Sequence, residues 1–421
     1  MSYFRDHGPY PYSYQQAHLP VREQKEAVGH AVREVYMTSA LADVGGEADP
    51  ELLEVSRRLY QNIVETQMSV TGGIGSMCDG EAFTFPYDLP NDRCYNETCA
   101  SIGLIMTSQR LLNLDRKAGY ADVLETALYN NMLAGVSLDG TKFFYVNPME
   151  VWPKRNHLRQ DMNEILTVRQ GWYGCACCPP NLLRTLFSLG QYIYSLGEKE
   201  LYVNLFIGSE AVFEVDGCKV RLKLATDYPR SGLADFTIEA EKPVDFTLCL
   251  RIPGWCGKAE LTVNENYLPL ELADGYARLA RTFRPGDRIR LDLEMKPEFL
   301  YCDDRVPYDA GKVALRRGPV VYCAEEKDNG SEIWNLTVNP RGPVDVRYDQ
   351  QLLGGVYVLS AEGARSHRRN GPLYSSEEPA EEAASVTWVP YYSWGNRGEG
   401  EMSVWLRTDG PDLLKTGKIL R

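Results

Sequence analysis

Three cysteines lie within four residues of the segment CACCPP (175–180), directly before a stretch that is typical of a helix. A disulfide between Cys177 and Cys178 is disfavoured, because adjacent Cα atoms are about 3.8 Å apart whereas disulfides prefer about 4.4 to 6.8 Å. Thiolates together with a carboxylate are ligands that suit zinc. Glu97 and Cys99, at the start of an earlier predicted helix, would complete a Zn²⁺ site with Cys177 and Cys178.

Three interpretations of this cluster stay open on the residues alone. A structural zinc site would tie two helix N-termini together, and buried free thiols would need no metal. A catalytic site is favoured by the strain that adjacent cysteines impose on a closed structural site, and by the carboxylate, which is an uncommon structural ligand. Helix N-termini also stabilise thiolates, the nucleophilic form of cysteine.

A glycine-rich stretch, TGGIGS (71–76) followed by GEAF (80–83), presents a single glutamate. A P-loop is excluded, because Glu81 stands where the phosphate-binding lysine belongs and Ala82 where a hydroxyl would hold magnesium. A dinucleotide-binding GxGxxG motif is excluded because Cys78 replaces its last glycine. Aromatic residues follow closely, so we predict that Glu81 is a partly desolvated acid with a raised pKa, suited to general acid catalysis. A solvated loop glutamate is the alternative.

Two further segments, YDLPND (87–92) and FFYVNP (143–148), mix aromatic side chains with Asp and Asn. Sugar-binding clefts offer such surfaces, but the core of a large helical domain contains the same residues. His30 lies on an apolar-periodic stretch, and the default interpretation is a histidine of the core.

The elements that must position these residues change in kind along the chain. Helical periodicity recurs in the segments 22–43, 51–65, 96–113, 120–136 and 180–197. Beyond them, short alternating runs separated by Gly, Pro and Asp are typical of antiparallel sandwiches, and a second such group closes the chain. The polar stretch from Ser366 to Ser385 is predicted to be a surface loop. The predicted fold class is multidomain, α then β, with domains at residues 1–195, 196–300 and 301–421.

Composition narrows the classes of partner. With 421 residues, 44% of them hydrophobic, the chain can bury large cores. Its net charge is −13 and no Lys/Arg block occurs, so nucleic acid is not an expected partner. No membrane-spanning run and no signal-peptide core occur in the sequence, so we expect no membrane partner and a cytoplasmic location. Eleven cysteines without an even framework agree with reduced thiols.

Together these segments resemble the bacterial β-L-arabinofuranosidase family, glycoside hydrolase family 127, a group of zinc-dependent retaining glycosidases. The similar motifs, in family order, are HAVREVYM (30–37), TGGIGS (71–76), GEAFTFPYDLPND (80–92), YNETCASIG (95–103), FFYVNPMEVWP (143–153), CACCPPN (175–181) and VPYYSWGNRGEGEMSVWL (389–406). The resemblance thus covers nearly the whole chain.

The resemblance implies that zinc is bound by Glu97, Cys99, Cys177 and Cys178. It implies that Cys177 is the nucleophile and Glu81 the general acid/base, and that His30 and Tyr145 lie close to the sugar. It further implies hydrolysis of non-reducing terminal β-L-arabinofuranosides in an oligosaccharide or glycoconjugate, and an (α/α)6 barrel followed by β-sandwich domains.

The number of predicted helices departs from the family pattern. A barrel of six helix pairs needs twelve helices, and five are predicted here, so we expect a partial (α/α)6 barrel that begins partway through the family pattern. A homo-oligomer, or a partner that supplies the missing half, would then complete it, and the natural N-terminus would lie upstream. The competing hypothesis is a catalytically incompetent, zinc-stabilised carbohydrate-binding or scaffold fragment.

Overall fold

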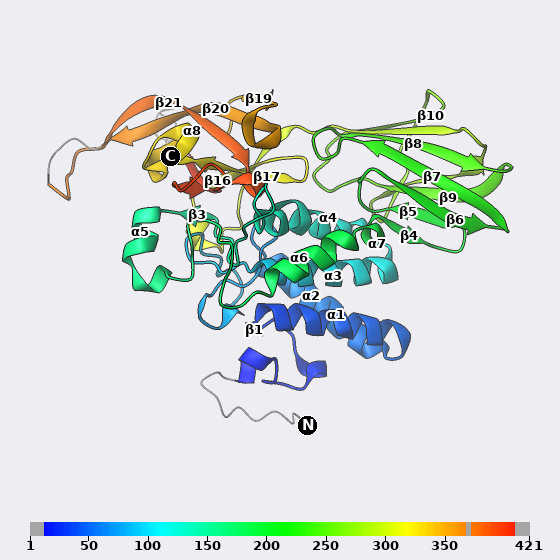
Figure 1. The fold of residues 1–421 in the computed structure, drawn as a ribbon, viewed down its shortest axis with the longest axis horizontal. Coiled ribbons are helices and arrows are strands. Elements are labelled where there is room, and N and C mark those ends of the chain that lie inside the picture. The colour runs from blue at the N-terminus through cyan, green and yellow to red at the C-terminus, as the bar shows by residue number, and fades with distance from the viewer. Residues whose placement is uncertain (1–11, 368–371, 409–421) are drawn as a thin grey trace, which may run out of the picture.

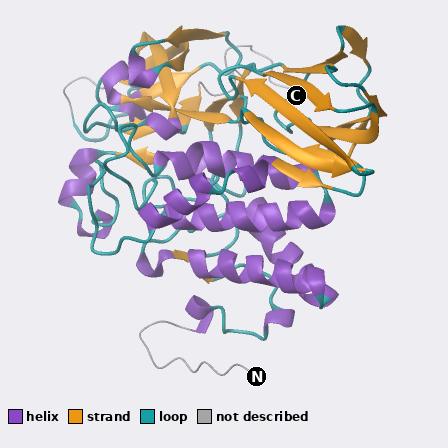
Figure 2. Ribbon diagram, turned by 45° about the vertical axis from the view of Figure 1, so that its right-hand side comes forward, coloured by secondary structure: helices purple, strands orange, loops and turns teal. Residues whose placement is uncertain are grey.

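The computed structural model describes residues 12–367 and 372–408, and it contains a helical part and two groups of strands (Figure 1). The helices stack in rows on one side of the molecule, and most strands lie on the other (Figure 2). The prediction of a multidomain chain, helical first and β-rich afterwards, is therefore confirmed.

The helical part is organised around α3. Its helices are α1 (Ala31–Glu47), α2 (Pro50–Thr66), α3 (Thr98–Asp115), α4 (Ala118–Ala127, continued by a π-turn at Leu128–Met132), α5 (Pro153–Leu158), α6 (Cys178–Phe187) and α7 (Gly190–Ile193). Helix α3 packs against α1, α4 and α6, and Leu104 and Ile105 are fully buried. Gly103 permits the close approach of α1, because a Cβ there would lie 2.3 Å from a methyl carbon of Val35.

Two predicted helices have other limits in the structure. The first helix starts at Ala31 and not at residue 22. The residues before it, β1 (Gly29–His30), have extended backbone and pair with β2 (Ala82–Phe83), so the helix cannot begin earlier. The last one ends at Phe187, and its predicted C-terminal turn is β4 (Tyr194–Leu196). In both places strand pairing overrides the helical period: β1 pairs with the distant β2, and β4 pairs with the strand that follows it.

Two antiparallel-rich sheets between residues 194 and 293 share one hydrophobic core. One has the order β11-β10-β14-β8-β7-β6 and the other β12-β13-β9-β5-β4. Their strands are β4 (Tyr194–Leu196), β5 (Glu200–Val203), β6 (Ser209–Val215), β7 (Cys218–Thr226), β8 (Leu233–Ala240), β9 (Val244–Arg251), β10 (Ala259–Val263), β11 (Asn266–Leu268), β12 (Leu272–Ala273), β13 (Tyr276–Phe283) and β14 (Arg288–Leu293). Alternate residues of β7 and β9, such as Leu222 and Leu248, enter the shared core.

The C-terminal strands form a further sheet, which in the described part of the chain has the order β15-β16-β23-β18-β20-β21-β17-β22-β3, with β19 beside β20. Its strands are β3 (Glu150–Val151), β15 (Pro297–Leu300), β16 (Lys312–Arg317), β17 (Val320–Glu325), β18 (Leu336–Val338), β19 (Val344–Asp349), β20 (Val356–His367), β21 (Ala380–Pro390), β22 (Met402–Ser403) and β23 (Leu406–Thr408); the short helix α8 (Glu326–Asn329) follows β17. The predicted loop from Ser366 to Ser385 is too long, since β21 already begins at Ala380 and pairs with β20.

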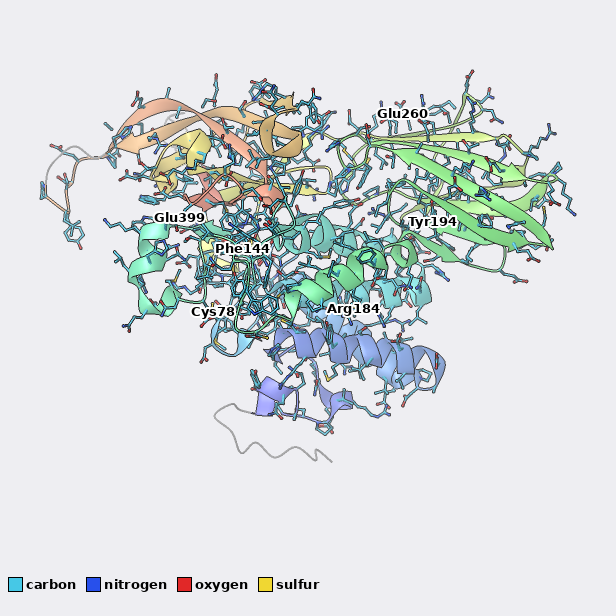
Figure 3. All side chains as sticks on the ribbon, in the orientation of Figure 1. Cys78, Phe144, Arg184, Tyr194, Glu260 and Glu399 are labelled. Carbon is cyan, nitrogen blue, oxygen red and sulfur yellow. The ribbon has the colours of Figure 1, made fainter. Side chains whose placement is uncertain are left out.

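Buried contacts join the β-rich parts to the helices. Arg251 at the end of β9 is fully buried and forms ion pairs with Asp122, at 2.6 Å, and with Glu125 of α4. Phe144 stacks on Trp394 with ring centroids 4.7 Å apart, where the helical part meets the C-terminal sheet (Figure 3). Among residues 12–367 and 372–408, no helix has the length and apolar character needed to cross a bilayer.

Candidate active site

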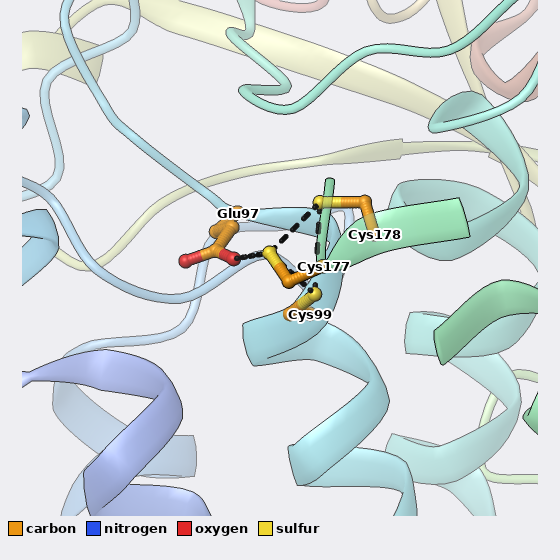
Figure 4. A group of neighbouring side chains, drawn as sticks. All are labelled: Glu97, Cys99, Cys177 and Cys178. Atoms are coloured by element: carbon orange, nitrogen blue, oxygen red, sulfur yellow. Dashed lines mark hydrogen bonds between the residues drawn. The ribbon is translucent and has the colours of Figure 1, made fainter. Parts of the chain in front are cut away.

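The four predicted zinc ligands converge at the N-termini of two helices (Figure 4). Glu97 is the N-cap of α3 and Cys99 lies in the first turn of that helix, whereas Cys177 is the N-cap of α6 and Cys178 its first residue. Both helix dipoles therefore point their positive ends at this cluster, which favours negatively charged ligands. Cys175 is exposed and lies outside the group.

The distances within the cluster match those of a four-coordinate zinc site. Tetrahedral zinc, with bonds of about 2.3 Å to sulfur and 2.0 Å to oxygen, would separate two sulfurs by about 3.8 Å and a sulfur from an oxygen by about 3.5 Å. The sulfur of Cys99 lies 3.5 Å from that of Cys177 and 3.6 Å from that of Cys178, and the last two are 3.8 Å apart. Glu97 Oε1 lies 3.4 Å from the sulfur of Cys177. The donor set and its spacing thus fit zinc.

The carboxylate of Glu97 has a further property of a metal ligand. Its Oε2 atom is buried and has no hydrogen-bond partner among the described residues. Burial, and next the neighbouring charge of Cys177, raise the pKa of Glu97 to about 9. Without a cation beside it this carboxyl would hold its proton at neutral pH, so a bound cation would restore its charge.

Negative charge in the cluster is concentrated on Cys177. Its pKa lies well below the ordinary thiol value, because the thiols of Cys178 and Cys99 and the hydroxyl of Tyr145 form hydrogen bonds with its sulfur. The Tyr145 oxygen is 3.1 Å from that sulfur. The hydrogen bonds with Cys177, together with burial, raise the pKa of Cys99 and Cys178. Cys177 is also the least buried of the three thiols, so its sulfur is the most accessible of the cluster.

Glu81 lies beside this cluster, on a loop with left-handed backbone. Its Oε1 accepts a hydrogen bond of 2.9 Å from the hydroxyl of Tyr95, and its Oε2 lies 3.0 Å from Nε2 of His30. Ligand atoms of His30, Glu81 and Glu97 all lie within 4.8 Å of one another. Because Glu97 also contacts Cys177, the carboxyl of Glu81 and the sulfur of Cys177 belong to one site.

The prediction of a raised pKa for Glu81 is wrong. The hydrogen bond from His30, assisted by Tyr95, outweighs partial burial and lowers the pKa of this carboxyl. The interpretation of His30 as a core residue is also wrong, because it is the N-cap of α1 and its side chain faces Glu81. Nδ1 of His30 accepts from the backbone N–H of Arg33, which leaves Nε2 as the donor toward Glu81.

Sequence reasoning missed the role of two tyrosines. Tyr95 donates a hydrogen bond to Glu81. In the sequence, the one signal for a role in the site is that Tyr95 lies two residues before Glu97, in the same motif. Tyr173 packs against Tyr145 with ring centroids 5.8 Å apart and so fixes the ring whose hydroxyl reaches Cys177. Tyr145 itself is held on the N-terminus of α3, where its carbonyl accepts from the Thr98 N–H.

Family models match consecutive parts of the chain. A model described as the catalytic domain of GH127 β-L-arabinofuranosidases matches residues 2–191. Models of the GH127 middle domain and of the glycoside hydrolase family 127 C-terminal domain match residues 200–295 and 297–407. The chain belongs to glycoside hydrolase family 127.

Individual GH127 relatives are similar over almost all of this chain. A curated protein of Bifidobacterium longum subsp. longum, named non-reducing end β-L-arabinofuranosidase, is 41% identical over 96% of this chain and 63% of its own length. A solved GH127 β-L-arabinofuranosidase from Geobacillus stearothermophilus has a TM-score of 0.92 at 45% identity, covering 94% of this chain and 63% of its own. A solved GH127 β-arabinofuranosidase gives 0.87 at 37% identity with the same coverage. This GH127 chain thus spans less than two thirds of each relative.

Proposed function

We propose that this GH127 chain carries the chemistry of a retaining exo-glycosidase that releases non-reducing terminal β-L-arabinofuranosyl residues from oligosaccharides or glycoconjugates. The observation that carries the proposal is geometric: the sulfur of Cys177, 3.1 Å from the Tyr145 hydroxyl, lies in the same site as the carboxyl of Glu81, which accepts a hydrogen bond from Tyr95. The β-L-arabinofuranosidase activity for which the relatives are named supports the choice of sugar.

In the proposed reaction, Zn²⁺ held by Glu97, Cys99, Cys177 and Cys178 would keep the nucleophilic thiol deprotonated and tune its leaving ability. The sulfur of Cys177 attacks the anomeric carbon and forms a carbon–sulfur bond as the bond to the leaving oxygen breaks. Glu81 donates its proton to that oxygen. A thiolate thus takes the place of the second carboxylate of an ordinary retaining glycosidase.

Glu81 then acts as a base. It takes a proton from a water molecule that attacks the anomeric carbon from the opposite face, and the carbon–sulfur bond breaks, so that the configuration is retained overall. The lowered pKa of Glu81 favours this second step, because it keeps the carboxylate charged. We assign His30 and Tyr145 to the sugar-binding surface, since both contact a reacting group and His30 remains partly accessible.

The same family membership supports a proposal for the architecture. We infer that the helical part belongs to an (α/α)6 barrel and that the two β-rich parts are sandwich domains. The domain limits 1–195, 196–300 and 301–421 are proposed with it; residues 1–11, 368–371 and 409–421 lie outside the described residues. Self-association, or completion of the barrel by a partner, stays a prediction, as does the cytoplasmic location.

The test measures hydrolysis of an aryl and of an unactivated β-L-arabinofuranoside. Cys177→Ser should lower kcat for both by at least about 10³-fold, because serine is hardly ionised near neutral pH. Cys175→Ser, a change of the exposed neighbouring cysteine, is the matched control and should retain activity. Glu81→Gln should lose about 10² to 10⁴-fold with the unactivated substrate and spare the first step with the good leaving group.

Two results would decide against the proposal. Near-normal rates in Cys177→Ser would exclude the thiolate mechanism. A wild-type chain that binds zinc and L-arabinose without turnover would favour the alternative, a non-catalytic zinc-stabilised carbohydrate-binding or scaffold protein.

A further inference from the structure

A segment of the C-terminal sheet reaches the loop that follows Glu81. The clamp segment (303–309) connects β15 to β16, and the acid/base loop (84–93) leads from Glu81 toward Tyr95 and Glu97. The two segments are far apart in sequence, yet several side-chain contacts join them.

Two hydrogen bonds with the clamp segment hold the acid/base loop at Asp88 and Asn91. The hydroxyl of Tyr308 donates to Oδ1 of Asp88 at 2.9 Å. Nδ2 of Asn91 donates to Oδ1 of Asp309 at 2.6 Å. Asn91 and Asp309 are both 4% exposed, so neither side chain can exchange this partner for bulk water without opening the structure.

The backbone of the acid/base loop needs such support. Tyr87 has a φ of 70°, a left-handed conformation that is unfavourable for a residue with a bulky side chain. The guanidinium of Arg305, in the clamp segment, lies 4.0 Å from the centre of the Tyr87 ring. Within the loop, Thr84 Oγ1 donates to Oδ2 of Asp88 at 2.6 Å, so Asp88 binds both the loop and Tyr308.

The loop is in turn connected to the backbone that carries the reacting groups. The carbonyl of Asn91 accepts hydrogen bonds from the N–H groups of Met149 and Glu150, both 3.0 Å long. The N–H of Asn147 donates to the carbonyl of Tyr95. A shift of the loop would therefore move both Tyr95 and the segment that follows Tyr145.

Both tyrosines contact reacting atoms. The Tyr95 hydroxyl donates to Glu81, and the Tyr145 hydroxyl lies 3.1 Å from the sulfur of Cys177. On the basis of the function proposed above, we propose that Tyr308 and Asp309 are positioning residues of the C-terminal sheet that hold the acid/base loop and thereby the orientation of Glu81. The C-terminal region then takes part in catalysis without contributing a group that touches the substrate.

The experiment uses four variants: Tyr308→Phe, Asp309→Ala, the double variant Tyr308→Phe/Asp309→Ala, and the conservative variant Asp309→Asn. Asparagine keeps an oxygen that can accept from Asn91, so it should restore what alanine loses. Tyr348→Phe and Asp345→Ala, both exposed on β19 of the same sheet, are the matched controls. Two quantities are measured on the full chain: kcat and KM for good and poor leaving groups, and amide hydrogen exchange of peptides covering residues 84–97.

We expect the combined variant to lose about 10-fold or more in kcat with the poor leaving group, much less with the good one, and to change KM little. Exchange in residues 84–97 should become faster, whereas exchange in β20 and β21 should not change. Equal losses with both leaving groups, or wild-type kinetics with unchanged exchange, would overturn the proposal. Failure of Asp309→Asn to restore kcat would also count against it.

Failure of the proposed function gives a different result. The wild-type chain itself would then have no glycosidase activity, whereas a failed positioning role leaves an active wild type with active variants. In an inactive chain the exchange measurement alone decides, and unchanged exchange in Tyr308→Phe/Asp309→Ala would show that the clamp segment does not hold the loop.

Discussion

The thiol cluster stands on the N-termini of two regular helices, whereas Glu81 stands on a loop with left-handed backbone that is held by side chains from elsewhere. The helices fix the cluster because Glu97 and Cys177 occupy their N-cap positions and Cys99 and Cys178 their first turns, and the four residues converge as the sequence suggested. The environment of Glu81 depends on His30 and Tyr95. His30 lies beside Glu81 because β1 pairs with β2, and Tyr95 reaches it because the loop after Glu81 returns toward that residue. Convergence of ligands was therefore predictable, and the electrostatics of the acid was not.

The largest effect is expected when two cysteines are removed from the cluster on the helix N-termini. We expect the wild-type chain to bind about one zinc ion, and the double variant Cys99→Ala/Cys178→Ala should bind none. Because metal binding contributes to folding, the variant should also unfold at a temperature lower by about 5 to 10 °C. Elemental analysis and thermal unfolding measure both effects. Cys175→Ala is the control, and full zinc binding by the double variant would show that these four residues are not the site.

A second test concerns the pKa of a carboxyl that is buried on a regular helix. Glu34 of α1 is fully buried, its Oε2 has no partner among the described residues, and burial raises its pKa to about 8. Between its ordinary pKa and about pH 8, the folded chain keeps a proton that the unfolded chain has lost. The free energy of unfolding should therefore fall as pH rises, by about 1.4 kcal/mol per pH unit at most.

Glu34→Gln should remove this slope. Denaturant unfolding of wild type and variant at several pH values between about 5 and 8 measures it. Glu47→Gln, at an exposed position of the same helix, should keep the wild-type slope. Parallel curves for wild type and Glu34→Gln would show that Glu34 ionises normally.

A smaller effect is expected at the loop-borne acid. His30→Ala removes the hydrogen bond that contributes most to the lowered pKa of Glu81, so this pKa should rise. With an unactivated substrate, which needs the protonated acid, the decline of kcat/KM at high pH should move upward. Tyr95→Phe should shift the profile in the same direction by less. An unchanged profile in both variants would mean that another group controls it.

The smallest change concerns the outer face of α6, whose N-terminus carries the thiols. Leu183 and Phe187 are 55% and 89% exposed, which leaves an apolar surface open to contact with other chains. Leu183→Lys/Phe187→Lys should reduce self-association in sedimentation velocity runs at several concentrations, and zinc content should not change. Self-association equal to that of the wild type would exclude this face as the contact.

Local signals predicted most of the fold, and non-local pairing accounts for the rest. The existence of α1, α2, α3 and α6 follows from helical periodicity, yet the start of α1 depends on pairing of His30 with Ala82. In the site, Cys99, Cys177 and Cys178 were identified by residue type and position before helices. The donors to Glu81 could not be, because no spacing in the sequence relates Glu81 to His30.

The pairing of β3 with β22 has a consequence for how the protein is made. Glu150 and Val151 belong to the part of the chain that carries Tyr145, but their strand partners, Met402 and Ser403, are among the last described residues. On the ribosome, the helices and both thiol-bearing segments leave the exit tunnel long before this partner strand is translated. The backbone beyond Tyr145 therefore reaches its final form only after residues 402–403 have been translated, when the helical part has had time to collapse around its core.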